Sequence, residues 1–289
     1  MHNSDVNLSV IVACFNAGET LAEQLNALIS QKWHHGWEVI VVDNRSTDNS
    51  RQIVESFKNR FMNLRIVNAS EKIGAAYARN VGIKCALSDR FVFCDADDKV
   101  ADGWVAAIGD ELEKYNVVVS KIDDQNLNEQ WVREIWKVQY TEPEPILGFL
   151  PGAACYGLGI TRRVYERVGE FDESLLRMSD IDYTWRIQLA GFDLRFLPHA
   201  VVHYRHRAKL KDMFIQAYKD GQAQVQLYKK YRDHGMPWKN LWNSIKSWIS
   251  MARNIPVLKE KVDKAKWLID LGFMTGRLRG SIRYRIAAL

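Results

Sequence analysis

The stretch FVFCDADDKV, residues 91–100, runs from apolar residues directly into three carboxylates, at Asp95, Asp97 and Asp98. Carboxylates held about 4 Å apart repel one another by roughly 1 kcal/mol in water and by more near a protein surface. Closure of a turn would explain Asp98, and helix capping would explain Asp102, which follows this segment. No capping role explains Asp95 and Asp97, and two carboxylates so close together are typical ligands of a hard divalent cation.

Short and nearly continuous apolar segments recur around this cluster, and they predict strands that are buried on both faces of a sheet. The expected strands are residues 8–13, 38–43, 64–68, 90–95 and 116–121. Helices between them are indicated by the spacing of Leu21, Leu25, Leu28 and Ile29, and by the small residues of GAAYARNVGIKCAL. Alternating strands and helices predict an α/β fold with a mainly parallel sheet, whose ligands bind beyond the carboxyl ends of the strands.

After residue 121 the pattern becomes irregular. Three prolines exclude a regular helix from YTEPEPILGFLPGAA, so we expect this segment to complete the sheet and to form part of a pocket wall. A helix is then predicted between a cap at Thr161 and Gly169, and another between Ser179 and Gly191. A last strand is expected in LRFLPHAVVHYRHR.

The composition is that of an ordinary globular protein. The 289 residues, 47% hydrophobic and 26% charged, suffice for two domains or for one large α/β unit with appended helices. The N-terminal segment shows no signal-peptide pattern, and no apolar run reaches the roughly 20 residues of a membrane span, so we expect a cytoplasmic protein. The four cysteines are scattered singly, which argues against a zinc site and a disulfide scaffold; we expect small buried hydrophobes.

Positive charge is concentrated towards the C-terminus. Residues 201–289 carry 19 Lys and Arg against 6 Asp and Glu, a net charge of +13, whereas the first 200 residues carry −8 of the overall +5. An acidic front part and a basic tail indicate two separate roles, with the basic part facing an anionic partner.

Six segments, taken in order, resemble the family 2 glycosyltransferases, which are inverting sugar transferases with the GT-A fold. The segments are VACFNAGETL, EVIVVDNRSTDNS, EKIGAAYARNVGI, FVFCDADD, TRRVYERVGEFDESL and SDIDYTWRIQLAG. The resemblance covers about residues 7–206 and implies a Rossmann-like, mainly parallel sheet flanked by helices, with a C-terminal helical extension. Residues 1–206 would form the nucleotide-sugar-binding and catalytic domain, and residues 207–289 a basic helical region.

The resemblance also implies roles for single residues. The pair Asp95 and Asp97 is similar to the family's DxD motif, in which Asp97 would hold Mg²⁺ or Mn²⁺ bridging the two donor phosphates, with Asp95 near the ribose and the metal. Asp43 is similar to the carboxylate that reads the nucleotide base, and Ala13 and Phe15 would line the same base pocket.

Three further positions follow from the same resemblance. Arg79 matches a residue near the base and the phosphates, and His203 becomes a candidate metal or phosphate contact. Asp180 corresponds to the catalytic base, although Ser179 stands where the family normally has an acidic residue. A base of this kind takes the proton of the acceptor hydroxyl and contributes about 10²–10⁴ in rate, while a divalent cation neutralises the charge that develops on the pyrophosphate.

Plainer readings of these residues stay open. Ser179 and Asp182 fit an S-x-x-D capping box, which explains those two and leaves Asp180 for catalysis. Asp43, without the other motifs, would be a turn former ahead of Asn44.

The C-terminal part of the resemblance has similar alternatives. His203 at a strand end is as readily structural as a ligand. Arg205 and His206 either close over the pyrophosphate or form a solvated basic loop. Trp185 is expected in the core, although an aromatic ring near a sugar site can stack on the acceptor.

The resemblance implies an inverting glycosyltransferase of the hexosyltransferase type. It would move a sugar from a nucleoside-diphosphate sugar to a hydroxyl of a glycan or lipid-linked acceptor, in cell-surface polysaccharide or glycoconjugate biosynthesis. The alternatives are a soluble small-molecule or peptide acceptor, and an inactive nucleotide-sugar-binding module. A nicotinamide-dependent dehydrogenase fits poorly, because CFNAGET has one glycine where a G-x-G-x-x-G turn is needed. No nucleic-acid partner is expected.

The basic tail contains an amphipathic pattern in LWNSIKSWISMA, residues 241–252. One helical stripe would hold Leu241, Trp242, Ile245, Trp248, Ile249 and Ala252. Such a stripe more often packs on the catalytic domain or on a second subunit, but beside basic residues in a region of charge +13 it also suits a membrane interface. We therefore expect this region to serve acceptor binding, association with the inner face of the cell membrane, or formation of a homo-oligomer.

Overall fold

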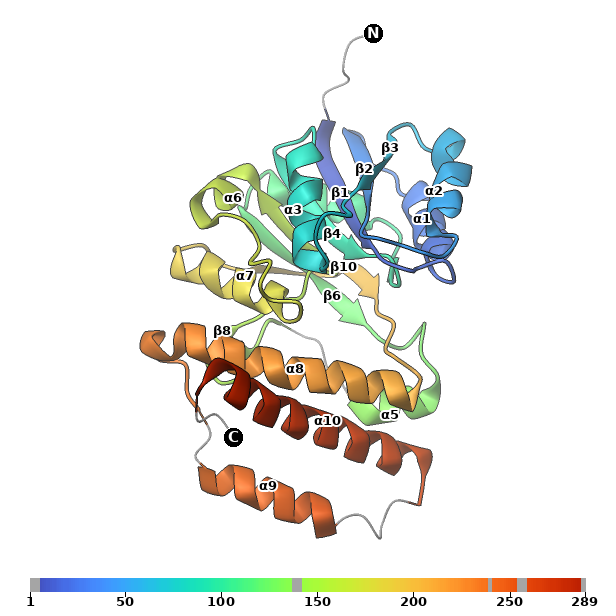
Figure 1. The fold of residues 1–289 in the computed structure, drawn as a ribbon. Helices are drawn as coiled ribbons and strands as arrows, with labels where there is room; N and C mark the ends of the chain where they lie inside the picture. The colour runs from blue at the N-terminus through green and yellow to red at the C-terminus, as the bar shows by residue number, and fades with distance from the viewer. Residues whose placement is uncertain (1–5, 137–141, 239–240, 254–258, 287–289) are drawn as a thin grey trace. The chain divides into compact units, whose positions relative to one another are not determined.

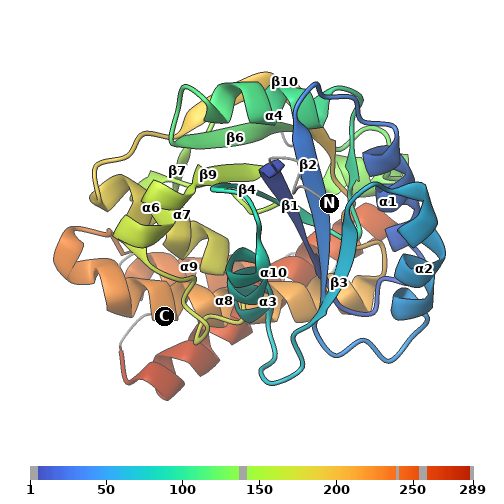
Figure 2. The ribbon, with the colours of Figure 1, turned by 90° about the horizontal axis from the view of Figure 1, so that it is seen from above.

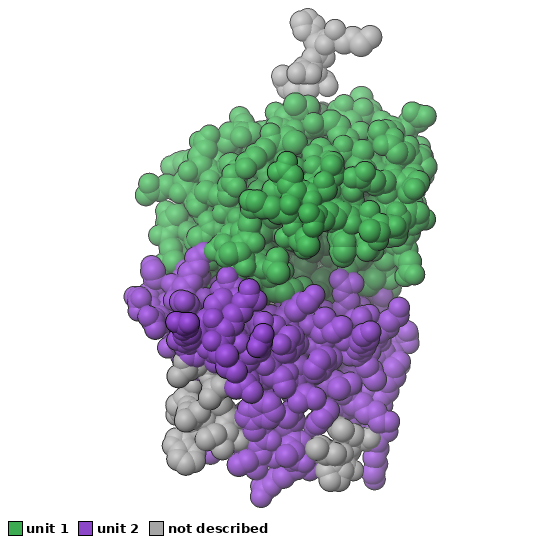
Figure 3. Space-filling view, viewed as in Figure 1, with its two compact units in different colours: residues 1–126, 140–144, 151–205 green, residues 127–139, 145–150, 206–289 purple. Residues whose placement is uncertain are grey.

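The computed structural model describes residues 6–136, 142–238, 241–253 and 259–286, and Figures 1 and 2 show its ribbon in two views. Contacts divide the described residues into two compact units, which Figure 3 distinguishes by colour. Unit 1 consists of residues 6–126, 142–144 and 151–205, and unit 2 of residues 127–136, 145–150 and the described part of 206–286. Residues 127–136 and 145–150 were expected in the first domain, whereas their contacts group them with the C-terminal helices.

Unit 1 is built on an eight-stranded sheet with the strand order β3-β2-β1-β4-β9-β6-β10-β5. Strands β1 to β4 are parallel, and so are β6 and β10, whereas β9 and β5 run antiparallel to their neighbours. The strands are β1 (Val6–Cys14), β2 (Gly36–Asp43), β3 (Leu64–Asn68), β4 (Arg90–Asp95), β5 (Lys99–Val100), β6 (Val117–Asp123), β9 (Leu158–Thr161) and β10 (Arg195–His203). The mainly parallel sheet and the strands predicted at residues 8–13, 38–43, 64–68, 90–95 and 116–121 and in 194–207 are confirmed. The proline-bearing segment was expected to complete this sheet, but its residues 145–146 and 150–151 pair in a separate two-stranded sheet.

Helices cover both faces of this sheet (Figure 2). Helices α1, α2 and α4 pack with Val10 and Val12 of β1, while α3, α6 and α7 pack on the other face with Ile11. Successive residues of β1 therefore enter two different cores, which is why the strand sequence is apolar throughout. These helices are α1 (Leu21–Ile29), α2 (Ser50–Phe57), α3 (Ala75–Cys85), α4 (Trp104–Leu112), α6 (Arg162–Val168) and α7 (Ser179–Leu189).

Two of the predicted helix caps do not form. Helix α4 begins at Trp104 after Gly103, which has a φ of 76°, so Asp102 does not cap it. Thr161 precedes α6 as predicted, but its hydroxyl donates to the Asn116 side chain, 3.1 Å away, and does not cap the helix. Both helix ends are therefore fixed by packing and backbone conformation.

The capping box predicted at the start of α7 is also wrong. Met178, with a left-handed φ of 57°, precedes the helix, and no side chain caps it. Asp182 is fully buried and accepts a hydrogen bond from Arg186 Nε at 2.8 Å. Asp182 therefore forms a buried ion pair within the helix, and Asp180 is left without a role in capping.

The four cysteines are free thiols. Cys14, Cys94 and Cys155 are buried, and burial raises the pKa of each thiol, that of Cys14 to about 11. These three side chains are neutral and pack as small apolar groups, as predicted. Cys85 is only half-buried.

In unit 2, α8 (Leu210–Tyr231) and α10 (Lys261–Tyr284) lie side by side and run in the same direction (Figure 1). Glycines of α10 face the backbone of α8 where the two helices approach most closely. The facing pairs are Gly272 with Phe214, Gly276 with Tyr218, and Gly280 with Gln222. A Cβ atom on Gly276 would lie only 2.0 Å from the Tyr218 carbonyl oxygen, so this close packing requires glycine.

Helix α5 (Gln130–Trp136) joins this pair through Val132, which is buried against Met213 and Ala265. Helix α9 (Leu241–Arg253) is attached to α10 by a hydrogen bond of 3.0 Å from the Trp267 indole to the Met251 carbonyl. The remaining short elements are η1 (Lys58–Arg60), β7 (Pro145–Ile146), β8 (Leu150–Pro151) and η2 (Arg232–His234).

The stripe predicted on residues 241–252 lies on α9. The side chains of Leu241, Trp242 and Ile245 lie outside the described residues, and Ile249 is half exposed. Among the helices that the structure describes, none combines the length and the apolar composition needed to cross a membrane.

Gly276→Ala should destabilise unit 2, because the new methyl group would collide with the α8 backbone. We expect the free energy of unfolding to fall by about 1–3 kcal/mol, the usual cost of overpacking, as measured by urea denaturation. Lys266→Ala, at an exposed position of the same helix, is the control and should stay within roughly 0.5 kcal/mol of the wild type. If the two variants had the same free energy of unfolding, α8 and α10 could move apart to accept the methyl group at no cost in stability.

Candidate active site

Strand register brings four of the predicted donor-binding residues to one edge of the sheet. Ala13 in β1 lies directly opposite Asp95 at the end of β4, and the next residue of β1, Cys14, lies opposite Asp43 at the end of β2. Phe15 follows β1, and its side chain is 63% exposed. Because β1, β2 and β4 are parallel, their carboxyl ends share the edge where α/β sheets bind ligands.

Three carboxylates gather at the end of β4. One oxygen from each of Asp95, Asp97 and Asp98 lies within 4.8 Å of the other two. Asp98 is 1% exposed, and burial, followed by the charges of Asp97 and Asp95, raises its pKa well above the usual range. Its Oδ1 accepts the backbone N–H of Arg205 at 2.9 Å, but its Oδ2 is buried without a hydrogen-bond partner in the described part of the chain. Such an oxygen is costly unless a proton or a cation satisfies it.

Arg205 binds the same cluster from the segment after β10. Its Nε donates to the Asp97 carbonyl oxygen at 3.0 Å, and its Nη2 donates to Glu23 at 2.6 Å. The solvated-loop alternative is therefore wrong for Arg205. It is also wrong for His206, a 9% exposed residue of unit 2 that stacks on Trp136 of the same unit.

Two members of this group were not predicted as site residues. Asp98 was expected to close a local turn, whereas it bonds to Arg205 across 107 positions of the chain. The third carboxylate of the DADD segment was the available signal. Glu23, which lies in the first turn of α1, carries no motif that would have singled it out.

Arg79 reaches this edge of the sheet from α3. Its Nη2 donates to Asp95 Oδ1 at 2.9 Å, and its side chain is 6% exposed. Burial acts to lower the pKa of Arg79, but the pKa is raised overall, and the nearby carboxylates of Asp95 and Asp180 contribute to that shift, so the guanidinium stays charged. Its Nε is buried with no partner among the described residues. A buried cation with a free donor suits an oxyanion such as a phosphate.

Asp180 lies in the first turn of α7, close enough to Arg79 and Asp95 for their charges to act on it. It is half-buried, and its Oδ1 accepts the Ile181 N–H at 2.9 Å. Burial raises the pKa of Asp180, while Arg79 opposes the shift. A carboxylate with a raised pKa is better suited to accept a proton near neutral pH. Trp185, on the same helix, is fully buried, as predicted.

The segment that leads to Asp180 is held by Asn80, the neighbour of Arg79 in α3. The Asn80 side chain is fully buried; its Nδ2 donates to the Phe171 carbonyl and to Glu173, each at 3.0 Å, and its Oδ1 accepts the Phe171 N–H at 2.9 Å. Adjacent residues of one helix therefore fix both the end of β4 and the approach to α7.

Asp43 already has partners for both carboxylate oxygens. Oδ1 accepts the Ser46 N–H at 3.1 Å, and Oδ2 accepts Arg51 Nε at 2.6 Å. The turn-forming role that the sequence left open is therefore present. A base-reading role stays a prediction, and it requires the nucleobase to share Asp43 with the half-exposed Arg51.

His203 ends β10, and its Nδ1 lies 2.6 Å from Asp123 Oδ2. An imidazole that donates from Nδ1 to a carboxylate keeps the lone pair of Nε2 for a metal or for another donor. The group of carboxylates at Asp95, Asp97 and Asp98 does not extend to His203 in the described residues. Its role as a metal contact stays a prediction.

A sequence profile described as "Glycosyl transferase family 2" matches residues 9–168, which is more than half of the chain. The matched span contains Ala13, Asp43, Arg79 and the carboxylates after β4. The chain belongs to glycosyl transferase family 2. It is a glycosyltransferase, as the sequence predicted.

Several relatives of this glycosyltransferase carry the same designation. Glycosyltransferase AglE of Haloferax volcanii is 27% identical over 76% of this chain and 74% of its own length. The amylovoran biosynthesis glycosyltransferase AmsB of Erwinia amylovora is 27% identical over 69% of this chain and 70% of its own length. The uncharacterized glycosyltransferase YibD of Escherichia coli is 29% identical over 58% of this chain, and the chain spans only 48% of YibD.

Solved structures show that this family 2 glycosyltransferase has the GT-A fold. S. aureus TarS 1–349 in complex with UDP-GlcNAc has a TM-score of 0.53 at 21% identity, over 97% of this chain and 93% of that one. The mannosyltransferase PcManGT from Pyrobaculum calidifontis, in complex with GDP-Man and Mn²⁺, has a TM-score of 0.60 at 18% identity. The match covers 98% of this chain and 76% of the PcManGT chain.

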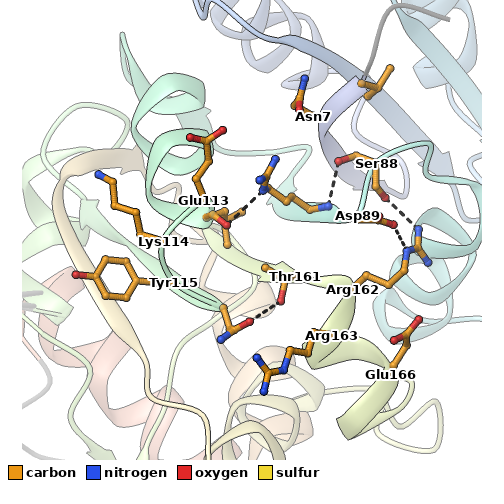
Figure 4. Close-up of a pocket in the computed structure, with 14 residues that line it drawn as sticks. Asn7, Ser88, Asp89, Glu113, Lys114, Tyr115, Thr161, Arg162, Arg163 and Glu166 are labelled. Carbon is orange, nitrogen blue, oxygen red and sulfur yellow. Dashed lines mark hydrogen bonds and ion pairs between the residues drawn. The ribbon is translucent and has the colours of Figure 1, made fainter.

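The glycosyltransferase also has a cavity of about 550 Å³ at the opposite edge of the sheet, where β1 and β4 begin (Figure 4). Two of its basic side chains already bond to the cavity walls: Arg162 pairs with Asp89, and Arg90 donates to the Leu112 carbonyl at 3.3 Å. The cavity lies away from the carboxyl ends of the strands and from the carboxylate cluster, so we do not assign the active site to it.

Asn80→Ala should lower the free energy of unfolding by about 2–4 kcal/mol, because it leaves the buried N–H and carbonyl of Phe171 unpaired. Chemical denaturation measures this loss. Asn26→Ala, at an exposed position of α1, is the matched control and should cost no more than roughly 0.5 kcal/mol. If both variants unfold at the same denaturant concentration, Asn80 does not hold the segment before α7.

Proposed function

We propose that this glycosyltransferase transfers a sugar, with inversion at the anomeric carbon, from a nucleoside-diphosphate sugar to an acceptor hydroxyl, and that it requires Mg²⁺ or Mn²⁺. The observation that carries the proposal is the cluster of Asp95, Asp97 and Asp98 next to the buried Arg79. A donor diphosphate and three carboxylates repel each other at one edge of a sheet unless cations separate them. A divalent ion together with the Arg79 guanidinium would supply that positive charge.

The cluster fits a hard divalent cation. Its donor atoms are carboxylate oxygens, and the buried Oδ2 of Asp98, which has no partner among the described residues, belongs to the same group. Asp97 would hold the ion, with Asp95 and Asp98 beside it. When bound, the ion would neutralise negative charge as it develops on the leaving diphosphate.

The nucleotide of the donor is assigned to the neighbouring strand ends. Ala13, Phe15 and Asp43 would surround the base, because they share the sheet edge with Asp95. The exposed ring of Phe15 offers a surface for stacking. The nucleotide-sugar complexes of TarS and PcManGT support a donor of this class. Screening hydrolysis of UDP-, GDP- and dTDP-sugars would identify the nucleotide.

In the proposed reaction the acceptor oxygen attacks the anomeric carbon from the face opposite the leaving group. Asp180 takes the proton of the acceptor hydroxyl as the new C–O bond forms. The bond from the anomeric carbon to the phosphate oxygen breaks, and its electron pair leaves with the nucleoside diphosphate, so the anomeric configuration inverts. Arg79, which lies close to both Asp180 and Asp95, stabilises the negative charge on the leaving group.

We propose a glycan or lipid-linked acceptor in the biosynthesis of a cell-surface polysaccharide or glycoconjugate. The relative AmsB, named for amylovoran biosynthesis, supports this class. The candidate base and the carboxylate cluster are both present, which favours an enzyme over an inactive nucleotide-sugar-binding module.

Asp97→Asn should abolish metal-dependent donor binding, because the amide lacks the charge that a hard divalent ion requires. Isothermal titration of UDP- and GDP-sugars with and without Mn²⁺ measures this effect. Asp102→Asn makes the same substitution at an exposed position outside the cluster and should bind like the wild type. Unchanged affinity and Mn²⁺ dependence in Asp97→Asn would refute the metal assignment.

Asp180→Asn should lower kcat by roughly 10²-fold or more and leave donor affinity nearly unchanged, because the amide has the same shape but cannot accept a proton. Steady-state kinetics at saturating acceptor measure this difference. Asp193→Asn, at an exposed position after α7, serves as the control. Normal turnover in Asp180→Asn would eliminate this residue as the base.

The pH dependence gives a second test of the same residue. A base acts only when deprotonated, and the raised pKa of Asp180 keeps its proton bound to a higher pH than usual for aspartate. The kcat should therefore rise with pH through that raised value, and this limb should be absent from the residual activity of Asp180→Asn.

A further inference from the structure

Helices α8 and α10 pack side by side and run in the same direction, so their carboxyl ends lie near each other in unit 2 (Figure 1). The Tyr284 hydroxyl donates to Gln226 Oε1 at 2.7 Å, and Lys229 Nζ donates to the Tyr284 carbonyl at 3.5 Å. These bonds join the last turns of the two helices into one surface, on which residues 55 to 58 positions apart in the chain are neighbours.

Positive charge gathers on this surface, which we call the basic end. It consists of Lys229, Lys230, Arg232, Arg279, Arg283 and Arg285, and all six side chains are exposed. The only carboxylate in residues 222–238 and 274–286 is Asp233, which lies 3.5 Å from Arg232. The basic end therefore carries a strong net positive charge.

Two large apolar side chains are exposed among these cations. Leu278 is 43% exposed and Ile282 is 64% exposed. They lie four residues apart on α10, so they share one face of the helix, and Arg279 and Arg283 follow them with the same spacing. A single exposed apolar side chain is ordinary, whereas a pair framed by arginines forms an amphipathic patch.

Helix electrostatics explain only part of this arrangement. The carboxyl end of a helix carries partial negative charge, so basic residues in the last turns of α8 and α10 are stabilised there. That effect accounts for the cations, since two helix ends coincide. It gives no reason for Leu278 and Ile282 to remain exposed between them.

We propose that the basic end is a docking surface for an anionic lipid bilayer. Its cations would contact phosphate headgroups, while Leu278 and Ile282 would enter the boundary between headgroups and acyl chains. A soluble polyanion would use the cations but would gain nothing from the two apolar side chains, and this difference favours a bilayer. The proposal concerns unit 2 alone and does not depend on the identity of the donor or of the catalytic base.

Vesicle co-sedimentation with the full chain tests this proposal. We expect binding to vesicles of phosphatidylcholine that contain phosphatidylglycerol, no binding to pure phosphatidylcholine, and weaker binding as salt is added. Failure to bind the anionic vesicles at low salt would overturn the proposal.

Two pairs of variants separate the charged and apolar contributions. Arg279→Glu with Arg283→Glu should weaken vesicle binding by at least about tenfold. The matched control, Arg163→Glu with Arg167→Glu, reverses two exposed arginines with the same spacing on α6.

The double variant Leu278→Ser with Ile282→Ser should weaken vesicle binding by about tenfold without any change in charge. Its control is Met62→Ser with Leu87→Ser, at two exposed apolar positions of unit 1.

The outcomes distinguish the alternatives. Equal losses in the two arginine pairs would mean that net charge, and not the basic end, governs binding. Unchanged binding of the Leu278 and Ile282 pair, together with competition by inorganic polyphosphate, would point to a soluble polyanion and overturn the bilayer assignment. Thermal melts of all four variants are expected to match the wild type, because every substituted side chain is exposed.

Discussion

The ion pair between the buried guanidinium of Arg79 and the partly exposed carboxylate of Asp95 is the interaction on which the candidate site depends. It connects α3 to the end of β4, and removing the carboxylate would leave the buried guanidinium without this partner. Its geometry depends in turn on Gly82, because a Cβ there would lie 2.5 Å from the Ile11 side chain and would push α3 away from the sheet. A single glycine thus lets the helix lie close enough for Arg79 to meet the carboxylates and for Asn80 to hold the segment before α7.

The charges of the site are balanced from two sides but not completely. Arg79 approaches from α3 and bonds to the Asp95 carboxylate. Arg205 approaches from the end of β10; its backbone N–H donates to the Asp98 carboxylate and its guanidinium donates to the Asp97 carbonyl oxygen. Neither guanidinium bonds to Asp98 Oδ2, which stays buried without a partner in the described residues. The protein therefore holds its carboxylates in place with arginines of its own, while one oxygen of Asp98 needs a proton or a cation to satisfy it.

The sequence predicted the parallel sheet because strands buried on both faces are apolar at every position, and that signal is local. Asp95 and Asp97 were predictable for a similar reason, since they follow such a strand directly. Arg205 and Glu23 could not be placed, because their contacts join residues 107 and 182 positions apart. The side-chain caps predicted for α4 and α7 do not form, because Gly103 and Met178, in left-handed conformations, precede these helices. The pairing of α8 with α10 depends on backbone contact at glycines. The spacing of apolar residues in the sequence does not indicate contact of this kind.

The position of β10 in the sheet has a consequence for how the enzyme is made. This strand comes last in the chain but lies between β6 and β5, so the sheet has an unfilled place until residues 195–203 have been synthesised. Arg205, which contacts the carboxylate cluster, leaves the ribosome later still. A nascent chain that ends before this point exposes the unpaired edge of β6 and an acidic cluster without one of its two arginines. The active site is thus among the last parts of unit 1 to assemble, and its completion depends on contacts of high sequence separation, which form slowly.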